Sequence, residues 1–540
     1  MKLNLLYLPN ETGEKLLECV KKEWKKVANS EVELKGSKYF LIEINDANNG
    51  YERTINTPQA IKVCSDEEAI SGILAINRIA YGNSDDDSII RRYNVLVCDN
   101  NIISTQVKYP AKNKEQIKYI KETENNKVAQ LAKRVFQLLG LDIGMINIAL
   151  TAKRRWRIIQ VDPTPNIRDK DLEQLIRKIK SLYNSEDYLI NNEIKMGADP
   201  EFMLFNTRNN KMLAASDYFP RDGQVGCDNI RIPNRQQRPV AEIRPKPDES
   251  PLKLAENIRQ SLIYASRLAP YQNVKWVAGS QPAGAYSIGG HIHFSRIQAN
   301  AWFLIALDNY LTIPVFLIEQ AATASKRRKK YGYLGDYRNK DHGGFEYRTP
   351  GSWLVSKDIS TAVLCLAKIV ASNYPRLDQN NLNNVEAQKA FYTGDQQYFT
   401  KIFPKIWNDI EKTAMFSEYA EQLEILPQMI QQGMHWDEKA DLRKAWSIST
   451  SNRKNNLNEK SNEKPSRPVS GISNSGQDST LTGRINRANA SSSSISAGSV
   501  NLNRSIRTQN QRNINNSRSN NTRPGGIITP QQIRRAHSVR

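Results

Sequence analysis

The stretch GADPEF at residues 197–202 decides the fold that we expect for this chain. Asp199 and Glu201 lie two residues apart in an apolar run. Side chains at that spacing on a β-strand point to the same face of the sheet. Later stretches repeat the spacing with other ionisable pairs: VAEIRP (240–245), GGHIHF (289–294) and GFEYRTPGSW (344–353). The sequence therefore predicts neighbouring strands that turn acids, imidazoles and guanidiniums toward one hollow.

Each of these pairs alone has an ordinary explanation. His-x-His occurs as a packed or surface pair, Asp-Pro-Glu occurs in turns, and Glu-x-Arg is often a weak surface ion pair. Four such pairs in one region need a further explanation, because buried charge at that density is costly unless it is paired or holds a ligand.

The residue types indicate what that ligand is. Carboxylates and imidazoles suit Mg²⁺ or Mn²⁺, and the arginines beside them suit phosphate or carboxylate groups. This combination favours phosphoryl transfer, in which catalysis is mainly positioning and charge neutralisation. A zinc hydrolase also combines His-x-His with acids, but that class does not explain the arginines.

These four stretches, with YGYLGDYR (331–338) before the last of them, resemble the phage-type carboxylate–amine ligase, type 2. That family is similar to glutamine synthetase and glutamate–cysteine ligase in its catalytic fold. The resemblance covers about residues 194–375 and implies an antiparallel sheet curved into a half-barrel, with ATP and metal ions in its funnel. It implies an ATP-dependent ligase that forms C–N bonds: a carboxylate is phosphorylated, and an amine then displaces phosphate to form an amide.

The resemblance also implies roles for individual side chains. The implied catalytic residues are Arg338, Arg348 and Arg244, and His291 and His293 face the nucleotide. The implied cofactors are ATP and Mg²⁺, with Mn²⁺ as an alternative. The first motif has an aspartate where the wider superfamily often has glutamate. The implied metal ligands are Asp199, Glu201, Glu242, His291 and Glu346.

The basic run KRRKK at residues 326–330 ends a predicted helix. Cations at a helix C-terminus have a plain explanation, because they complement the helix dipole. The functional alternative is that Arg327 or Arg328 binds the nucleotide phosphates.

The first 190 residues predict a smaller α/β unit, of which residues 85–170 resemble the C-terminal part of an ATP-grasp domain. In that family a strand usually ends in Glu-x-Asn-Pro, which holds the Mg²⁺ of ATP, whereas this chain has Gln160 and Asp162 before Pro163. Glutamine is a neutral and poorer ligand, which weakens a metal site. The unit is therefore either an inactive or substrate-holding remnant or a working second ligase.

Periodicity and turn residues predict the local elements of the chain. The predicted strands form two hairpins, Tyr93–Cys98 with Ile102–Val107 and Met145–Leu150 with Trp156–Val161. The predicted helices are Val128–Leu139, Asp169–Tyr183, one from Ser250-Pro251 to Leu268, Ala299–Ser325 with a kink at Pro314, and several over 386–446.

We expect an α+β protein with a glutamine synthetase-like antiparallel curved sheet and helices, preceded by the smaller ATP-grasp-like unit. The longest apolar stretch, Ala299 to Ala322, contains Asp308 and Glu319, so it predicts a buried core helix rather than a membrane span. The expected domains are 1–190 (ATP-grasp-like), 191–375 (catalytic core), 376–450 (helical) and 451–540 (tail).

The tail carries much of the net charge of +21, with 15 Lys and Arg against 3 Asp and Glu over residues 451–540. It has no aromatic residue and is rich in Ser, Asn and Arg, which predicts disorder. A solubilising appendage and a tether to nucleic acid or another polyanion both fit this composition.

Five scattered cysteines without metal-type spacing predict free thiols in a reducing compartment, and we expect a cytoplasmic protein without a membrane partner. The expected substrates are small-molecule or peptide carboxylates and amines. The rival hypothesis is a non-catalytic binding or scaffold protein with degenerate ATP-binding folds and a polyanion-binding tail.

Overall fold

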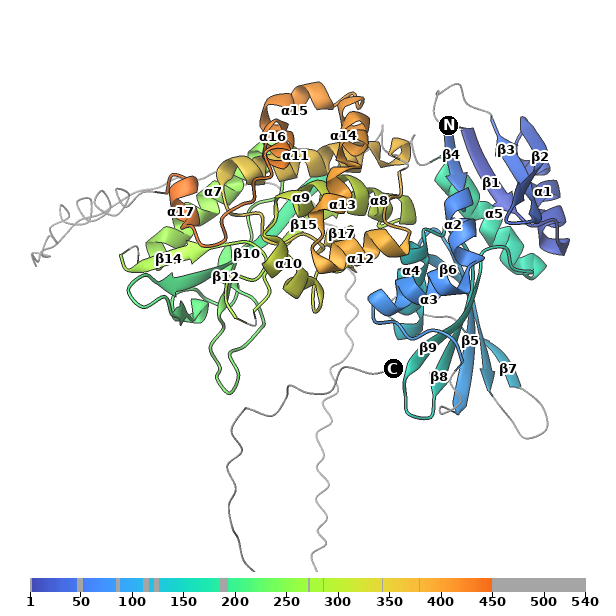
Figure 1. Cartoon of the computed structure of the whole chain (residues 1–540), viewed down its shortest axis with the longest axis horizontal. Helices are drawn as coiled ribbons and strands as arrows, with labels where there is room; N and C mark the ends of the chain where they lie inside the picture. The colour runs from blue at the N-terminus through green and yellow to red at the C-terminus, as the bar shows by residue number, and fades with distance from the viewer. Residues whose placement is uncertain are drawn as a thin grey trace, which may run out of the picture. The chain divides into compact units, whose positions relative to one another are not determined.

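The computed structural model describes residues 2–45, 52–83, 88–109, 116–120, 126–184, 193–270, 272–284, 286–341, 343–377 and 379–448 (Figure 1). The predicted tail at 451–540 lies outside these residues. The described residues all belong to one compact unit, Met1–Lys464.

The N-terminal region begins with a four-stranded sheet in the order β2-β3-β1-β4. In this sheet β1 pairs antiparallel with β3 and parallel with β4. Its strands are β1 (Lys2–Tyr7), β2 (Val27–Leu34), β3 (Ser37–Ile44) and β4 (Glu52–Ile55). The helices of this part are α1 (Glu11–Glu23), α2 (Pro58–Cys64) and α3 (Glu67–Ile76).

A five-stranded antiparallel sheet follows in the order β7-β6-β5-β8-β9, and it contains both predicted hairpins. Asp99 and Asn100 turn the first hairpin with φ of 49° and 59°, a conformation that Asn and Asp tolerate better than most residues. The strands are β5 (Ile89–Cys98), β6 (Asn101–Tyr109), β7 (Gln116–Ile120), β8 (Ile143–Thr151) and β9 (Trp156–Asp162). The predicted helices are confirmed as α4 (Lys127–Leu139), which ends at Gly140, and α5 (Asp169–Tyr183).

The third sheet has eight strands around β10 (Lys195–Asn206), in the order β12-β13-β10-β15-β17-β16, with β11 and β14 also paired to β10. All its named pairs are antiparallel, which confirms the predicted fold class. The other strands are β11 (Met212–Leu213), β12 (Val225–Cys227), β13 (Val240–Ile243), β14 (Val274–Val277), β15 (Gly290–Ser295), β16 (Tyr337–Asn339) and β17 (Phe345–Tyr347).

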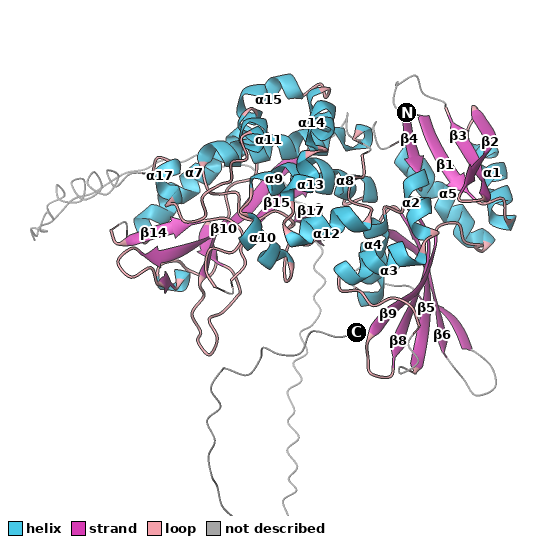
Figure 2. Cartoon of the chain, viewed as in Figure 1, coloured by secondary structure: helices cyan, strands magenta, loops and turns pink. Residues whose placement is uncertain are grey.

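Helices pack beside this sheet and make up the end of the described chain (Figure 2). Ser250 caps α7 by accepting from the backbone N–H of Lys253, as the sequence predicts. The helices are α7 (Pro251–Leu268), α8 (Ala301–Ala306), α9 (Ile313–Ile318), α10 (Ala321–Arg328), α11 (Lys357–Asn373), α12 (Val385–Thr393), α13 (Gln396–Thr400), α14 (Phe403–Glu411), α15 (Phe416–Leu423), α16 (Ile425–Gln431) and α17 (Leu442–Ala445), with short 3₁₀ turns at Ala215–Asp217 and Tyr374–Arg376.

The prediction of one helix over Ala299–Ser325 is wrong, because the helix ends at Ile318 and α10 starts at Ala321. The Gln396 side chain donates to the carbonyl of Phe316 at 2.7 Å and to that of Glu319 at 2.9 Å, so it satisfies backbone groups that a continued helix would use. The irregularity expected at Pro314 is a π-helical segment, Leu307–Thr312, between α8 and α9. Proline cannot donate a backbone hydrogen bond, and π-bulges are one way in which helices absorb such a gap.

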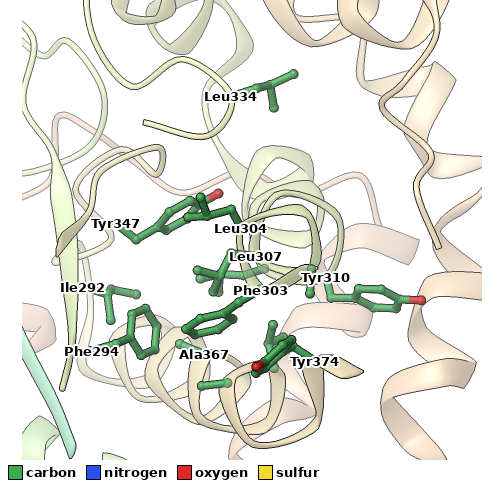
Figure 3. Close-up of a cluster of buried hydrophobic side chains, with 14 of the residues drawn as sticks. Ile292, Phe294, Phe303, Leu304, Leu307, Tyr310, Leu334, Tyr347, Ala367 and Tyr374 are labelled. Carbon is green, nitrogen blue, oxygen red and sulfur yellow. The ribbon is translucent and has the colours of Figure 1, made fainter. Parts of the chain in front are cut away.

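The continuous helical stretch Ala301–Ile318 is long and apolar enough to cross a membrane by length and composition, yet the fold buries all of it. Figure 3 shows Phe303, Leu304 and Leu307 from this stretch beside Ile292 and Phe294 from β15. The Phe294 and Phe303 rings pack edge to face with centroids 5.1 Å apart. Since side chains alternate along a strand, the core positions of β15 fix His291 and His293 on the opposite face.

A buried carboxylate joins the N-terminal region to the start of this core helix. Asp99, 8 % exposed, accepts from the backbone N–H of Ala301 at 2.9 Å. Burial raises the pKa of Asp99 to about 7. Asp99 is therefore a group whose protonation is linked to folding.

We predict that the free energy of unfolding carries a pH-dependent contribution from Asp99. Between about pH 4 and pH 7 the folded protein keeps a proton that the unfolded chain has lost, so this contribution falls as the pH rises. Asp99→Asn keeps the turn and the hydrogen-bond acceptor but cannot ionise. The free energy of unfolding of this variant, relative to that of the native chain, should therefore increase between about pH 4.5 and about pH 7.5. Urea unfolding of both proteins at the two pH values measures this, and an equal difference at both would contradict it.

Candidate active site

The strand register brings the predicted site residues to one face of the eight-stranded sheet. On β10, Asp199 lies opposite His291 of β15, and Glu201 lies opposite Glu242 of β13. On the other edge of β15, His293 lies opposite Glu346 of β17, which in turn lies opposite Arg338 of β16. Strands far apart in the sequence thus place acids and cations side by side.

Asp199 is the centre of the cluster. One of its oxygens, Oδ1, lies 2.9 Å from Nδ1 of His291, and Oδ2 lies 3.1 Å from Nε2 of His293. Burial opposes ionisation of Asp199, but the two imidazoles outweigh it and hold its pKa well below the usual range. Asp199 is therefore a fully charged acceptor at neutral pH.

Glu346 is fully buried and receives contacts from several cationic side chains. Its Oε1 lies 3.3 Å from Nδ1 of His291 and 3.1 Å from Nε of Arg348. Its Oε2 lies 2.5 Å from Nη2 of Arg338 and also contacts Nζ of Lys340. Burial works against the charged form of Glu346, but His291 and Lys340 lower its pKa.

The His291 ring lies between the two carboxylates and a phenol. Burial alone would lower the pKa of His291, but the charge of Asp199 outweighs it and raises the pKa to about 9. Its Nε2 contacts the hydroxyl of Tyr331. A Cβ at Gly289 would lie 2.5 Å from that nitrogen, so this position needs glycine for the ring to fit.

Glu201 and Glu242 are placed differently from the other predicted ligands. Glu201 accepts from the backbone N–H of Gly289 at 2.6 Å, and burial raises its pKa to about 7. Glu242 pairs with Arg244 at 2.6 Å, yet burial and the charge of Asp199 raise its pKa to about 8. Both carboxyls face the same hollow but lie outside the tightest group of acids and imidazole.

A cavity of about 410 Å³ opens over this face of the sheet. Glu346 lies buried beside it rather than in its lining. The predicted residues that line it are Asp199, Glu201, Glu242, Arg244, His291, His293, Arg338 and Arg348. Sequence reasoning missed Arg221, Asp222, Asp228, Asn229 and Lys340 in the lining.

Lys340 could have been found by the rule that found the others, because it follows Arg338 at the same two-residue spacing. Tyr331 lay within a stretch that the resemblance uses, but only the fold reveals its contact with His291. The loop that carries Arg221 and Asp228 has no comparable pattern in the sequence.

Arg327 and Arg328 do not line the cavity, contrary to the expectation that one of them binds phosphates. Arg327 donates to the carbonyls of Thr349 at 2.6 Å and Arg348 at 3.0 Å. Arg328 is 4 % exposed and forms a buried ion pair with Glu319. Burial leaves both guanidiniums without access to a ligand in this arrangement. Their contacts instead hold the chain around the site.

The donor set fits a divalent cation. Asp199, His291 and Glu346 are all buried and offer ligand atoms that lie within 4.8 Å of one another. Oε1 of Glu346 and Nε2 of His293 are buried, and the ion pairs that they form with Arg348, His291 and Asp199 do not have the geometry of hydrogen bonds. A bound ion would satisfy the hydrogen-bonding capacity that these buried atoms leave unused.

The ATP-grasp-like region lacks such a group within the residues that the structure describes. Gln160 is exposed on β9, and Asp162 accepts from the backbone N–H of Thr164 at 2.9 Å, which closes a turn. These two positions therefore serve the strand and its turn.

Residues 196–448 match the family model described as Phage phiEco32-like COOH.NH2 ligase-type 2. The match confirms the resemblance read from the five sequence stretches, and it extends through the C-terminal helices to the end of the described chain. No curated protein matches the chain.

Solved structures give weaker likenesses. The ATP-grasp ligase PsnB complexed with its minimal precursor is 17% identical over 17% of this chain and 34% of that chain, with a TM-score of 0.15. The bifunctional glutathione synthetase from Pasteurella multocida is 10% identical over 52% of this chain and 51% of that chain, with a TM-score of 0.31. Plasmodium falciparum glutamine synthetase is 10% identical over 67% of this chain and 96% of that chain, with a TM-score of 0.24. The chain thus spans about a third of the length of PsnB.

We predict that Asp199→Asn weakens Mn²⁺ binding by at least about tenfold, because even the hydrogen-bond partners of metal ligands typically account for about 10–100-fold in affinity. Calorimetric titration with Mn²⁺ measures the change. Glu249→Gln is the matched control, since Glu249 forms an ion pair with Arg296 outside the cavity. Equal Mn²⁺ affinity of the Asp199 variant and the native chain would contradict a role in metal binding.

Proposed function

We propose that residues 196–448, which match the model of the phage-type carboxylate–amine ligase family, use ATP and Mg²⁺ to form an amide or peptide-type bond through an acyl phosphate. The observation that carries the proposal is the buried group of Asp199, His291 and Glu346, with ligand atoms within 4.8 Å of one another. Arg338 and Arg348 contact the same Glu346 carboxylate. Metal ligands and phosphate-binding cations together are the equipment for phosphoryl transfer.

The proposed reaction has two steps. A substrate carboxylate oxygen attacks the γ-phosphorus of ATP, the bond to the β-phosphate oxygen breaks, and ADP leaves. The nitrogen of an amine then attacks the carbonyl carbon of the acyl phosphate and loses a proton, and inorganic phosphate leaves with the C–O bond electrons. The products are an amide, ADP and phosphate.

Asp199, His291 and Glu346 would hold the divalent ion, and Mg²⁺ or Mn²⁺ suits their oxygen and nitrogen atoms. The ion, when bound, supplies positive charge that screens the phosphate oxygens. The five sheet strands that carry the site fix these side chains before substrate arrives. Such preorganisation is what makes electrostatic stabilisation effective.

Arg338 is the side chain best placed to neutralise the transferring phosphoryl group. Its side chain is 57% exposed, whereas its partner Glu346 is fully buried. The Arg338 guanidinium can therefore leave the Glu346 carboxylate and bind phosphate oxygens in the cavity that it lines. Arg348 is more enclosed, and Asp336 lies 3.6 Å from it, so it would bind without large movement.

We propose that the substrates are a small-molecule or peptide carboxylate and an amine, because both cations and carboxylates line the cavity. Arg221 and Arg244 suit a carboxylate, and Asp222 and Asp228 suit an ammonium group.

The most direct test incubates the full chain with ATP, Mg²⁺ and pools of carboxylates and amines, and detects new amides by mass spectrometry together with ADP. We expect amide and ADP to form in equal amounts, and Asp199→Asn to abolish both. Asp162→Asn is the matched control in the ATP-grasp-like region, and it should keep full turnover. ADP release without any amide, or full turnover by the Asp199 variant, would reject the proposal.

Arg338→Ala should lower kcat by about 10²-fold while KM for ATP changes little, because its charge is needed most as the phosphoryl group transfers. Steady-state kinetics with the identified substrate pair measure both constants. Arg338→Lys, which keeps the charge but not the planar fork, should recover part of the rate. A variant with raised KM and native kcat would instead assign Arg338 to ground-state binding.

A further inference from the structure

The loop at residues 329–336 connects α10 to β16 and carries side chains that orient the site. Tyr331 contacts Nε2 of His291, and its ring lies 4.8 Å below the Arg348 guanidinium. Asp336 accepts from the backbone N–H of Gly332 and lies 3.6 Å from Arg348. One side of this loop therefore sets the positions of two proposed site residues.

The other side of the loop rests on the N-terminal region. The Arg134 guanidinium of α4 lies 4.0 Å from the centre of the Tyr333 ring, within the range of a cation–π contact. Nη1 of Arg78 donates to the carbonyl of Lys329 at 2.6 Å. These contacts reach the loop from α4 and from the turn after α3, more than 190 residues earlier in the chain.

The side chain of Gln137 of α4 lies against Gly335 of the loop. Gly335 has φ of 65°, and a Cβ there would lie 2.1 Å from the amide atoms of Gln137. The positive φ therefore favours glycine at this position, and a larger residue would displace the Gln137 amide.

A buried carboxylate of the core helix ties the three parts together. Asp308 is 4 % exposed and accepts from Nε2 of Gln137 at 3.0 Å and from the backbone N–H of Gly335 at 3.0 Å. It also accepts from the hydroxyl of Tyr347 at 2.6 Å, and Tyr347 is the neighbour of Glu346 on β17. Helix α4, the loop and the strand with a proposed metal ligand thus share one acceptor.

We infer that the N-terminal region serves the ligase reaction by holding this loop in its active arrangement, with Arg134 and Gln137 as positioning residues. The role of the loop in turnover rests on the proposed function. The contacts that order the loop do not, because they join only groups of this chain. The region needs no nucleotide of its own for this task, which accords with the use of Asp162 in a turn.

The test compares Gln137→Ala, and the double variant with Arg134→Ala, with the native full chain. Hydrogen exchange of the peptide covering 329–337 should speed up by about tenfold or more, because the loop opens locally without these contacts. The kcat of amide formation should fall by about tenfold or more at nearly unchanged KM for ATP, because small misplacements of reacting groups are costly. Arg134→Lys should recover part of the kcat that Arg134→Ala loses.

Arg157→Ala is the matched control. Arg157 is also an N-terminal arginine that donates to backbone carbonyls, those of Tyr81 and Gly82, but it does not contact the loop. It should lower the melting temperature without changing exchange in the loop or kcat.

Unchanged loop exchange in the double variant would overturn the inference, and so would faster exchange at native kcat. A native chain without amide formation would reject the proposed function instead, while the exchange data would still decide whether the N-terminal region orders the loop. If the double variant melts below the assay temperature, Gln137→Ala alone decides.

Discussion

The pairing of β10 with β15 is the constraint on which the site depends, because it sets Asp199 against His291. The opposite faces of these strands are apolar, with Ala198 and Ile292 in the core. A register slip by one residue would exchange the two faces, and buried charges would meet the aromatic core. Burying so many ionisable groups is costly, and the contacts of Asp199 and Glu346 with imidazoles and guanidiniums offset that cost.

The same core helix that packs under the sheet also organises its surroundings. Its first turn meets Asp99 of the N-terminal region, and its π-helical segment presents Asp308 to Gln137 and Tyr347. The two regions thus share one buried scaffold, through which the ATP-grasp-like unit contacts residues next to a site that it does not line. The long apolar stretch of this helix is buried within the fold.

The sequence alone predicts the same-face pairs well, because a period of two follows from strand geometry and needs no knowledge of partners. It also predicts that Arg244, Arg338 and Arg348 line the cavity, but it is wrong about Arg327 and Arg328. Arg327 and Arg328 look like the exposed basic end of a helix, and only the fold reveals that backbone carbonyls and Glu319 take them up. The break after Ile318 was missed for a similar reason, since Gln396, which satisfies the freed carbonyls, lies 78 residues further along the chain. Local patterns fix local geometry, whereas these outcomes depend on contacts between distant segments.

The central claim, that this face of the sheet binds a nucleotide-bound divalent ion, is tested most directly by electron spin-echo spectroscopy of Mn²⁺ and ADP on the full chain. We predict a nitrogen coupling from a directly bound imidazole, which His291→Gln removes while Mn²⁺ still binds ADP. A native spectrum with phosphate and water couplings but no imidazole nitrogen would contradict metal binding by His291 and its carboxylate neighbours.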